Sequence, residues 1–380
     1  MLKNKIYNYF FKEVFKSFFI ILFALSIIAW TARAVNFLDL IIENGYSVTS
    51  YFKFTLLYLP NIVTKFIPIS FLISLLTSII KFKRQNEFSI LWTSGVKKIK
   101  IINLFLYISV LVLLIQLILS IFVNPFYLDQ SRKMLNKSEL NSLNAVIKSN
   151  DFIDIFKNTT FFVGKVNENL EMENLLIRDE SNVFNSLVKA TENNSDVTIL
   201  AKKGLFKDGK LILIDGLIQT KSSKDEIDNL NFSKTELFID NFTSRTTPLP
   251  KVKEVSTFNL FKCINQKKDQ NTDSLVFNCD EQALKDNALE NLSRRIGMPF
   301  YIPVITLILS FLVLSNVKSE NNFLKKYFYF LICFMVLILA EISVRFTGHS
   351  IINTYIYFLM PAILCPLVYL LLIFKLRKKI

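Results

Sequence analysis

Histidine is almost absent from this chain of 380 residues, which contains only His349. Zinc sites built on histidine and Ser-His-Asp triads both need an imidazole placed beside other specific groups. A single histidine argues against both kinds of site, and no spacing of the carboxylates singles out a catalytic pair. We therefore expect a chain that is not an enzyme and that holds no metal and no cofactor.

Cysteine is scarce as well, with four residues in the whole chain. Cys333 and Cys365 fall inside apolar segments, where a thiol acts as a small packing residue. Cys263 and Cys279 flank a polar segment of 15 residues. A disulfide between them would stabilise the fold by about 3 kcal/mol through loop closure. The alternative is a pair of buried thiols.

Acidic residues are rare outside the middle of the chain. Residues 124–293 contain 22 Lys or Arg and 25 Asp or Glu, whereas the rest contains 23 basic residues and six acidic ones. The overall net charge of +14 is therefore not spread over one surface, as it would be in a nucleic-acid-binding protein. It is concentrated in short segments beside apolar runs, so we expect no nucleic-acid partner.

Long apolar runs are what the sequence has in abundance. They lie near 14–35, 51–80, 101–123, 298–317, 324–346 and 355–374. A helix that crosses a membrane needs about 20 mostly apolar residues. The sequence thus predicts an α-helical integral membrane protein with six transmembrane helices. Its parts are helices 1–3 in residues 1–123 with a cytoplasmic loop at 81–100, an inserted domain at 124–293, and helices 4–6 in residues 294–380.

The positive residues predict the orientation of these helices. Four segments that alternate along the chain carry 17 Lys or Arg, whereas the two short loops at 32–50 and 345–354 carry only Arg33 and Arg345. Because positive loops stay in the cytoplasm, we expect both termini there and the inserted domain in the periplasm. The alternative is a signal peptide cleaved near Ala32-Arg33-Ala34, against which the Arg and the upstream Glu13 both weigh.

The inserted domain alternates short β-rich runs with turn residues. The runs cover 152–156, 159–163, 174–178, 196–200 and 210–214. This spacing predicts an all-β domain of the jelly-roll, sandwich or open-barrel kind. The segment Gly204–Lys210 matches the front of a phosphate-binding loop. Leu211 stands where that loop needs Ser or Thr, and an apolar strand follows in place of a helix, so we predict a β-hairpin instead.

The second apolar run is unusual because it contains Lys53, Pro60, Lys65 and Pro68. A charge inside the bilayer is costly, so it lies at the interface, beside a partner or in an aqueous cavity. We expect Lys53 to lie above the bilayer. Lys65 is deeper, and two roles stay open for it: snorkelling to the interface or lining a cavity.

The loop at 81–100 contains a pattern typical of a short amphipathic helix. Phe88, Leu91 and Trp92 are spaced to share one helix face, Gly95 can end the helix, and Glu87 is near its start. Transporters use such helices to dock on a separate motor subunit. The alternative is an interfacial helix anchored by lysine and tryptophan.

Three short patterns occur in order along the chain. They are Tyr9-x-x-x-Glu13-x-x-Lys16, Glu87-x-x-x-Leu91-x-x-x-Gly95 and Arg294-Arg295-x-x-x-Pro299. Together with three spans on each side of a β-rich insert, they make the whole chain resemble the lipopolysaccharide export permeases LptF and LptG, of the YjgP/YjgQ type. The start of the chain and Arg295-Ile296 look more like LptF. One departure is Asn291-Leu292, where the family usually has Glu-Leu; Glu290 is one place earlier.

The resemblance implies a set of partners and a location. The chain would be a permease subunit of an ABC-type transporter in the bacterial inner membrane, paired with a second permease, LptG or LptF. A dimeric ATPase, LptB, would drive it from the cytoplasm. Lipopolysaccharide would be extracted from the inner membrane and passed through periplasmic β-domains, with LptC, toward LptA. The alternative is a membrane-anchored periplasmic interaction protein without transport activity.

The resemblance also implies roles for particular residues. Glu87 would engage the ATPase, on a loop helix whose other marked residues are Phe88, Leu91, Trp92 and Gly95. Arg33 and Arg345, at the outer ends of the first and fifth spans, would meet the phosphates of the lipid, since arginine suits bidentate contacts with phosphate. The alternative for both arginines is anchoring at the membrane interface.

Overall fold

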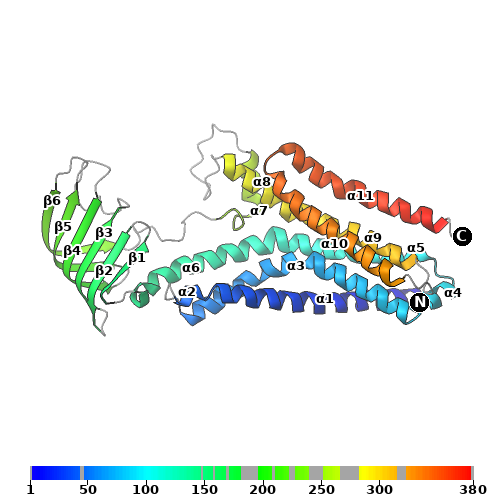
Figure 1. Ribbon diagram of the computed structural model, residues 1–380, viewed down its shortest axis with the longest axis horizontal. Helices are drawn as coiled ribbons and strands as arrows, with labels where there is room; N and C mark the ends of the chain where they lie inside the picture. The colour runs from blue at the N-terminus through cyan, green and yellow to red at the C-terminus, as the bar shows by residue number, and fades with distance from the viewer. Residues whose placement is uncertain are drawn as a thin grey trace. The chain divides into compact units, whose positions relative to one another are not determined.

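The computed structural model describes residues 2–42, 47–146, 149–156, 159–167, 171–180, 196–207, 210–221, 227–238, 251–265, 282–314 and 322–377. The chain divides into two compact units, each visible in Figure 1. The membrane unit comprises Met1–Arg33, Leu57–Asp129 and Pro250–Ile380, and the sheet unit comprises Ala34–Leu56 and Gln130–Leu249. The domain limits drawn from the sequence stay a prediction.

Among the residues that the structure describes, six helical segments are long and apolar enough to cross a membrane, as predicted. They contain α1 (Leu2–Asn36), α3 (Val48–Arg84), α5 (Lys98–Ile118), α9 (Tyr301–Leu314), α10 (Asn322–Thr347) and α11 (Ile351–Arg377). The third and fourth segments, Lys98–Leu135 and Leu284–Leu314, extend beyond α5 and α9 into the neighbouring helices. A π-helical turn (Leu119–Val123) joins α5 to α6 (Asn124–Val146), and a 3₁₀ turn (Met298–Phe300) joins α8 (Gln282–Gly297) to α9. The short helices are α2 (Asp39–Ile42), α4 (Glu87–Thr93) and α7 (Thr257–Asn265).

The core of the membrane unit lies where α1, α3, α5 and α9 meet. Helix α9 is buried over nearly its whole circumference, whereas α10 and α11 expose large apolar side chains, such as Leu339 and Leu370. A helix that is apolar all round is expected inside a bundle, and exposed apolar faces suit contact with lipid. Phe18 and Phe71 join α1 to α3 in an edge-to-face ring contact at 5.9 Å.

The sheet unit contains six antiparallel strands that pair in chain order. They are β1 (Asp151–Phe156), β2 (Thr159–Val166), β3 (Glu171–Asp179), β4 (Asp196–Lys207), β5 (Lys210–Lys221) and β6 (Ile227–Phe238). This confirms the inserted β-domain. Strands β4 and β5 pair as far as Lys207 opposite Lys210, so the Gly204–Lys210 segment is a hairpin and not a phosphate-binding loop. Lys210 also donates to Glu236 on β6 (3.2 Å), which holds the pKa of that carboxyl below its usual range.

Strand β6 was not predicted from the sequence. Its side chains are mostly exposed, and its sequence is rich in Asp, Asn, Lys and Glu, which strands usually avoid. Among the strand residues whose side chains the structure describes, Leu237 is the one buried apolar residue. The strand forms because β5 offers it a complete ladder of backbone partners, from Lys210 opposite Phe238 to Lys221 opposite Ile227.

A buried arginine fixes the segment that leads into α7. The side chain of Arg295 is 7% exposed. Its guanidinium donates to the carbonyls of Val255 (3.0 Å), Lys253 (2.9 Å) and Val252 (3.4 Å) and to the hydroxyl oxygen of Thr257 (2.9 Å). A buried charge is tolerated when its donors are satisfied, and here four oxygens satisfy them.

The same contacts reach the third span. The hydroxyl of Thr257 donates to the carbonyl of Ile121 at 2.8 Å, inside the π-helical turn between α5 and α6. Arg295 therefore connects α8, the segment before α7, and the π-helical turn within the membrane unit.

We predict that Arg295→Lys destabilises the membrane unit by about 2–4 kcal/mol, because a lysine ammonium cannot reach four acceptors in fork geometry. Thermal unfolding of the purified protein in detergent measures the change. Arg294→Lys is the matched control, since Arg294 is half-buried and pairs with two carboxylates, which a lysine can also do. Equal melting temperatures for parent and Arg295→Lys would contradict the structural role.

Candidate functional site

A polar cavity of about 420 Å³ lies inside the membrane unit. Helix α3 contributes Asn61, Thr64 and Lys65, and the third span contributes Gln116, Ser120 and Asn124. An apolar wall faces them, formed by Met298, Phe334, Leu337 and Ile338. Ligand sites typically combine such an apolar wall with a few polar groups. The cavity is therefore a candidate binding site between membrane spans.

The polar side of the cavity follows from a proline in α3. Pro68 has no N–H, so the carbonyl of Thr64, four residues earlier, loses its helical donor. Gln116 of α5 supplies a replacement, since its side-chain amide donates to that carbonyl at 3.5 Å. The hydroxyl of Thr64 in turn approaches the Asn124 oxygen at 3.2 Å. The amide oxygen of Gln116 is buried and has no hydrogen-bond partner among the described residues.

Four cationic residues and one carboxylate border this cavity: Lys65, Lys253, Arg294, Arg295 and Glu341. Arg294 donates to Glu290 on its own helix at 3.1 Å and forms an ion pair with Glu341 on α10. Lys65 forms no ion pair with any residue that the structure describes. Of its two roles left open by the sequence, the structure supports lining the cavity. The cavity thus has an excess of positive charge, suited to an anionic group.

Arg33 and Arg345 are not among the residues that line the cavity. Both side chains are exposed, at the end of α1 and near the end of α10. The guanidinium of Arg33 lies 5.9 Å from the ring centre of Tyr58, a cation–π distance. Arg294, Arg295 and Lys253 were not predicted from the sequence as cavity residues. Arg294 and Arg295 could have been found from their position at the entry of an apolar span.

The loop helix α4 forms where it was predicted. Gly95 follows the helix with φ of 82°. The amide of Gly95 donates to the carbonyl of Trp92 at 3.2 Å, and the amide of Val96 donates to the carbonyl of Leu91 at 3.0 Å. This is the Schellman arrangement, in which glycine takes the left-handed position and the last carbonyls are satisfied.

The apolar face of α4 packs on its own chain. Phe88 and Leu91 are buried, and the Phe88 ring lies 6.0 Å from Phe10 of α1 and 5.8 Å from Phe82 of α3. Trp92 stacks on Phe88 at 5.8 Å. These three residues therefore hold the helix in place, and the side facing away from this packing carries Ile90, which is 63% exposed.

Glu87 lies at the start of α4 and is fixed by the first helix. The Tyr9 hydroxyl donates to Glu87 Oε1 at 2.9 Å, and the other carboxylate oxygen is buried without a hydrogen-bond partner in the part of the chain that the structure describes. Glu13, one turn after Tyr9, pairs with Lys81 at the end of α3. Two sequence patterns, one at Tyr9–Lys16 and one at Glu87–Gly95, thus meet in space.

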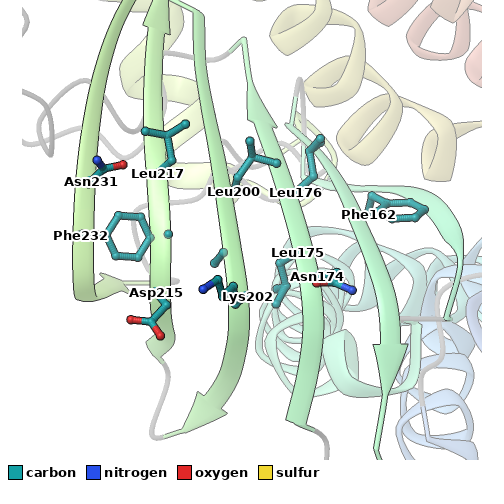
Figure 2. Close-up of a pocket in the computed structure, with 12 residues that line it drawn as sticks. Phe162, Asn174, Leu175, Leu176, Leu200, Lys202, Asp215, Leu217, Asn231 and Phe232 are labelled. Carbon is teal, nitrogen blue, oxygen red and sulfur yellow. The ribbon is translucent and has the colours of Figure 1, made fainter.

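The sheet unit has an open hollow of about 740 Å³ on one face (Figure 2). A row of side chains crosses it, one from each of the five strands β2 to β6, because Phe162, Leu176, Leu200, Leu217 and Asn231 are successive cross-strand partners. The row is apolar over four strands and polar on the fifth. It could hold an apolar chain, and it offers no catalytic pair.

The hollow lies beside a bend in the sheet. Buried positions on β5 run Leu211, Leu213 and then Ile218, so the two-residue alternation breaks between them. Asp215 has a positive φ of 52° in this interval, as Asn174 does on β3 (57°). Gly216 lets Phe232 and the Leu200 carbonyl approach, since an added Cβ would lie 2.3 Å from each.

The cysteines lie in different settings. Cys333 is buried and Cys365 half-buried, and both are free thiols inside spans, as expected. Cys263 is buried in α7 and disulfide-bonded. Cys279 lies outside the described residues, so the pairing of these two stays a prediction. Within the described ranges, no group of three or more His, Cys, Asp or Glu side chains could hold a metal ion.

Six apolar spans among the described residues, a polar cavity between them and an inserted antiparallel β-domain define a multi-pass membrane protein. The chain matches the family "Lipopolysaccharide export system permease LptF/LptG" over residues 8–375, and it belongs to this family. This confirms the resemblance noted in the sequence. The family includes both LptF and LptG, so the preference for LptF stays a prediction.

A similar curated protein is "Uncharacterized protein RP871" of Rickettsia prowazekii (strain Madrid E). It is 25% identical over 240 residues, which cover 63% of this chain and 65% of that protein. The chain therefore matches just under two thirds of the length of this relative.

Proposed function

We propose that this chain is a non-catalytic permease subunit of an ABC-type exporter, which extracts lipopolysaccharide from the inner membrane and passes it to a periplasmic bridge. The observation that carries the proposal is the cationic cavity between the spans of a chain of the LptF/LptG family. A protein that only anchors a periplasmic domain would not need Lys65 among its spans, where no described residue pairs with its charge, because such charges are costly there.

The proposal includes the orientation and the partners. Both termini and α4 lie in the cytoplasm, and the β-domain lies in the periplasm, in accord with the distribution of Lys and Arg. The ATPase is an LptB dimer, the second permease is LptG for an LptF-like chain, and LptC and LptA receive the lipid. Because ATP is hydrolysed in the cytoplasm, the Glu87 experiment below also tests this orientation.

The lipid substrate carries phosphates, and the positive groups of the membrane unit are suited to them. Arg33 and Arg345 contact phosphates at the outer ends of α1 and α10, and Lys65 offers a further charge inside the cavity. Such contacts are stronger in a partly desolvated site than in bulk water, since the local dielectric constant is lower.

We predict that Glu87→Ala lowers the amount of ATPase that co-purifies with this chain by about tenfold, as expected when one partner of a charged contact is removed. The tagged chain is purified in mild detergent, and the rate of ATP hydrolysis is measured per mole of purified chain. Glu87→Gln keeps the size of the side chain and loses only its charge, so it should lower ATPase co-purification as well if the charge makes the contact. If Glu87→Ala leaves both the complex and lipid export unchanged, Glu87 does not couple to the ATPase.

We predict a graded response at Arg33 and Arg345. Lysine keeps the charge and loses the bidentate fork, glutamine loses both, and glutamate adds repulsion. Crosslinking to lipopolysaccharide should therefore fall in the order Arg, Lys, Gln, Glu, by about fivefold from Arg to Gln at each position. A flat series at equal protein levels would show that these arginines only anchor their helices.

A further inference from the structure

The first span and the loop helix are joined by polar contacts at the cytoplasmic end proposed above. Tyr9 and Glu13 are four residues apart on α1, so they lie on one face of that helix. Tyr9 donates to Glu87 at the start of α4, 78 residues away in sequence. Glu13 pairs with Lys81, three residues before the end of α3.

The ring of Tyr9 is held in place by its neighbours. It lies edge-on to Phe10 at 5.7 Å and 6.3 Å from Phe82. Phe10 is itself buried 4.3 Å from the Phe82 ring. Tyr9 is nevertheless 46% exposed, so its hydroxyl adds little to the apolar core and its clear role is the hydrogen bond to Glu87.

Only one of the two carboxylate oxygens of Glu87 has a hydrogen-bond donor among the described residues. One oxygen accepts from Tyr9, and the other is buried with no hydrogen-bond partner among the described residues. No cation pairs with Glu87 in the described part of the chain, although its loop carries six Lys or Arg. A buried carboxylate oxygen without a donor costs free energy, so a second donor at the start of α4 would stabilise Glu87.

We propose that Tyr9 is a positioning residue that ties α4 to the first span, so that motion imposed on α4 by the ATPase is carried to α1. The Glu13–Lys81 pair makes a second tie on the same face of α1. Helix α1 continues to Asn36 and carries Arg33 near its far end. Motion of α4 thereby reaches the arginine assigned to the lipid phosphates. This inference rests on the proposed function, and it adds a residue whose loss separates ATP hydrolysis from lipid movement.

Tyr9→Phe tests the tie, because it removes the hydroxyl and keeps the ring. In the full complex, reconstituted in proteoliposomes, the ATPase should co-purify at the parental ratio and hydrolyse ATP at close to the parental rate. Lipopolysaccharide released per ATP should fall by about fivefold, the effect of losing roughly one hydrogen bond. Tyr7→Phe is the matched control. Tyr7 lies one turn of α1 away from Phe10, and its hydroxyl forms no hydrogen bond within the described ranges.

A second measurement needs no partner. Amide hydrogen exchange at residues 87–93 should be faster in Tyr9→Phe than in Tyr7→Phe, since the start of α4 has lost its tie. Unchanged exchange, or hydrolysis and lipid release that fall in equal proportion, would overturn the inference. If Glu87→Ala leaves complex formation and export unchanged, the proposed function is wrong. If Glu87→Ala disrupts both and Tyr9→Phe leaves the amount of lipopolysaccharide released per ATP unchanged, only the role of Tyr9 is wrong.

Discussion

A charged or strongly polar group among apolar spans is stable only when it finds a partner, and the architecture of the membrane unit depends on how each such group is satisfied. Arg295 is surrounded by four oxygens and becomes part of the fold. Arg294 is held between Glu290 and Glu341. Lys65 borders the same cavity and has no ion-pair partner in the described ranges. This difference separates Arg294 and Arg295, which are satisfied within the fold, from Lys65, whose charge is not paired by any described residue.

The cavity exists because helical regularity is interrupted around it. Pro68 leaves a carbonyl of α3 without its helical donor, and the side-chain amide of Gln116 in α5 donates to that carbonyl. A π-helical turn places Ser120 on the cavity wall, and the carbonyl of Ile121 accepts from Thr257. Interruptions of this kind are tolerated in spans when neighbouring groups satisfy the freed backbone. They also create polar surface at membrane depth, which a bundle of regular helices would lack.

Much of the fold could be predicted from the sequence, because each span exceeds the length a bilayer needs and each strand up to β5 contains an apolar β-rich run. Strand β6 could not, since its residues are polar and its pairing is supplied by β5. The start of α4 was predicted from Glu87 and its end from Gly95. The cavity was not predicted, because it joins residues as far apart as Lys65 and Glu341 through tertiary packing. Lys65 itself was noted from its depth in an apolar run, and only the packing distinguished lining a cavity from snorkelling.

The central claim is that the cationic cavity receives the anionic lipid. A photo-crosslinking amino acid at Ile338, on the cavity wall, tests it in the full complex in membranes, with the same amino acid at the exposed neighbour Leu339 as the control. The account predicts an adduct with lipopolysaccharide at position 338 that exceeds the one at 339 and that is reduced by Lys65→Glu. Equal adducts at both positions, unaffected by Lys65→Glu, would contradict it.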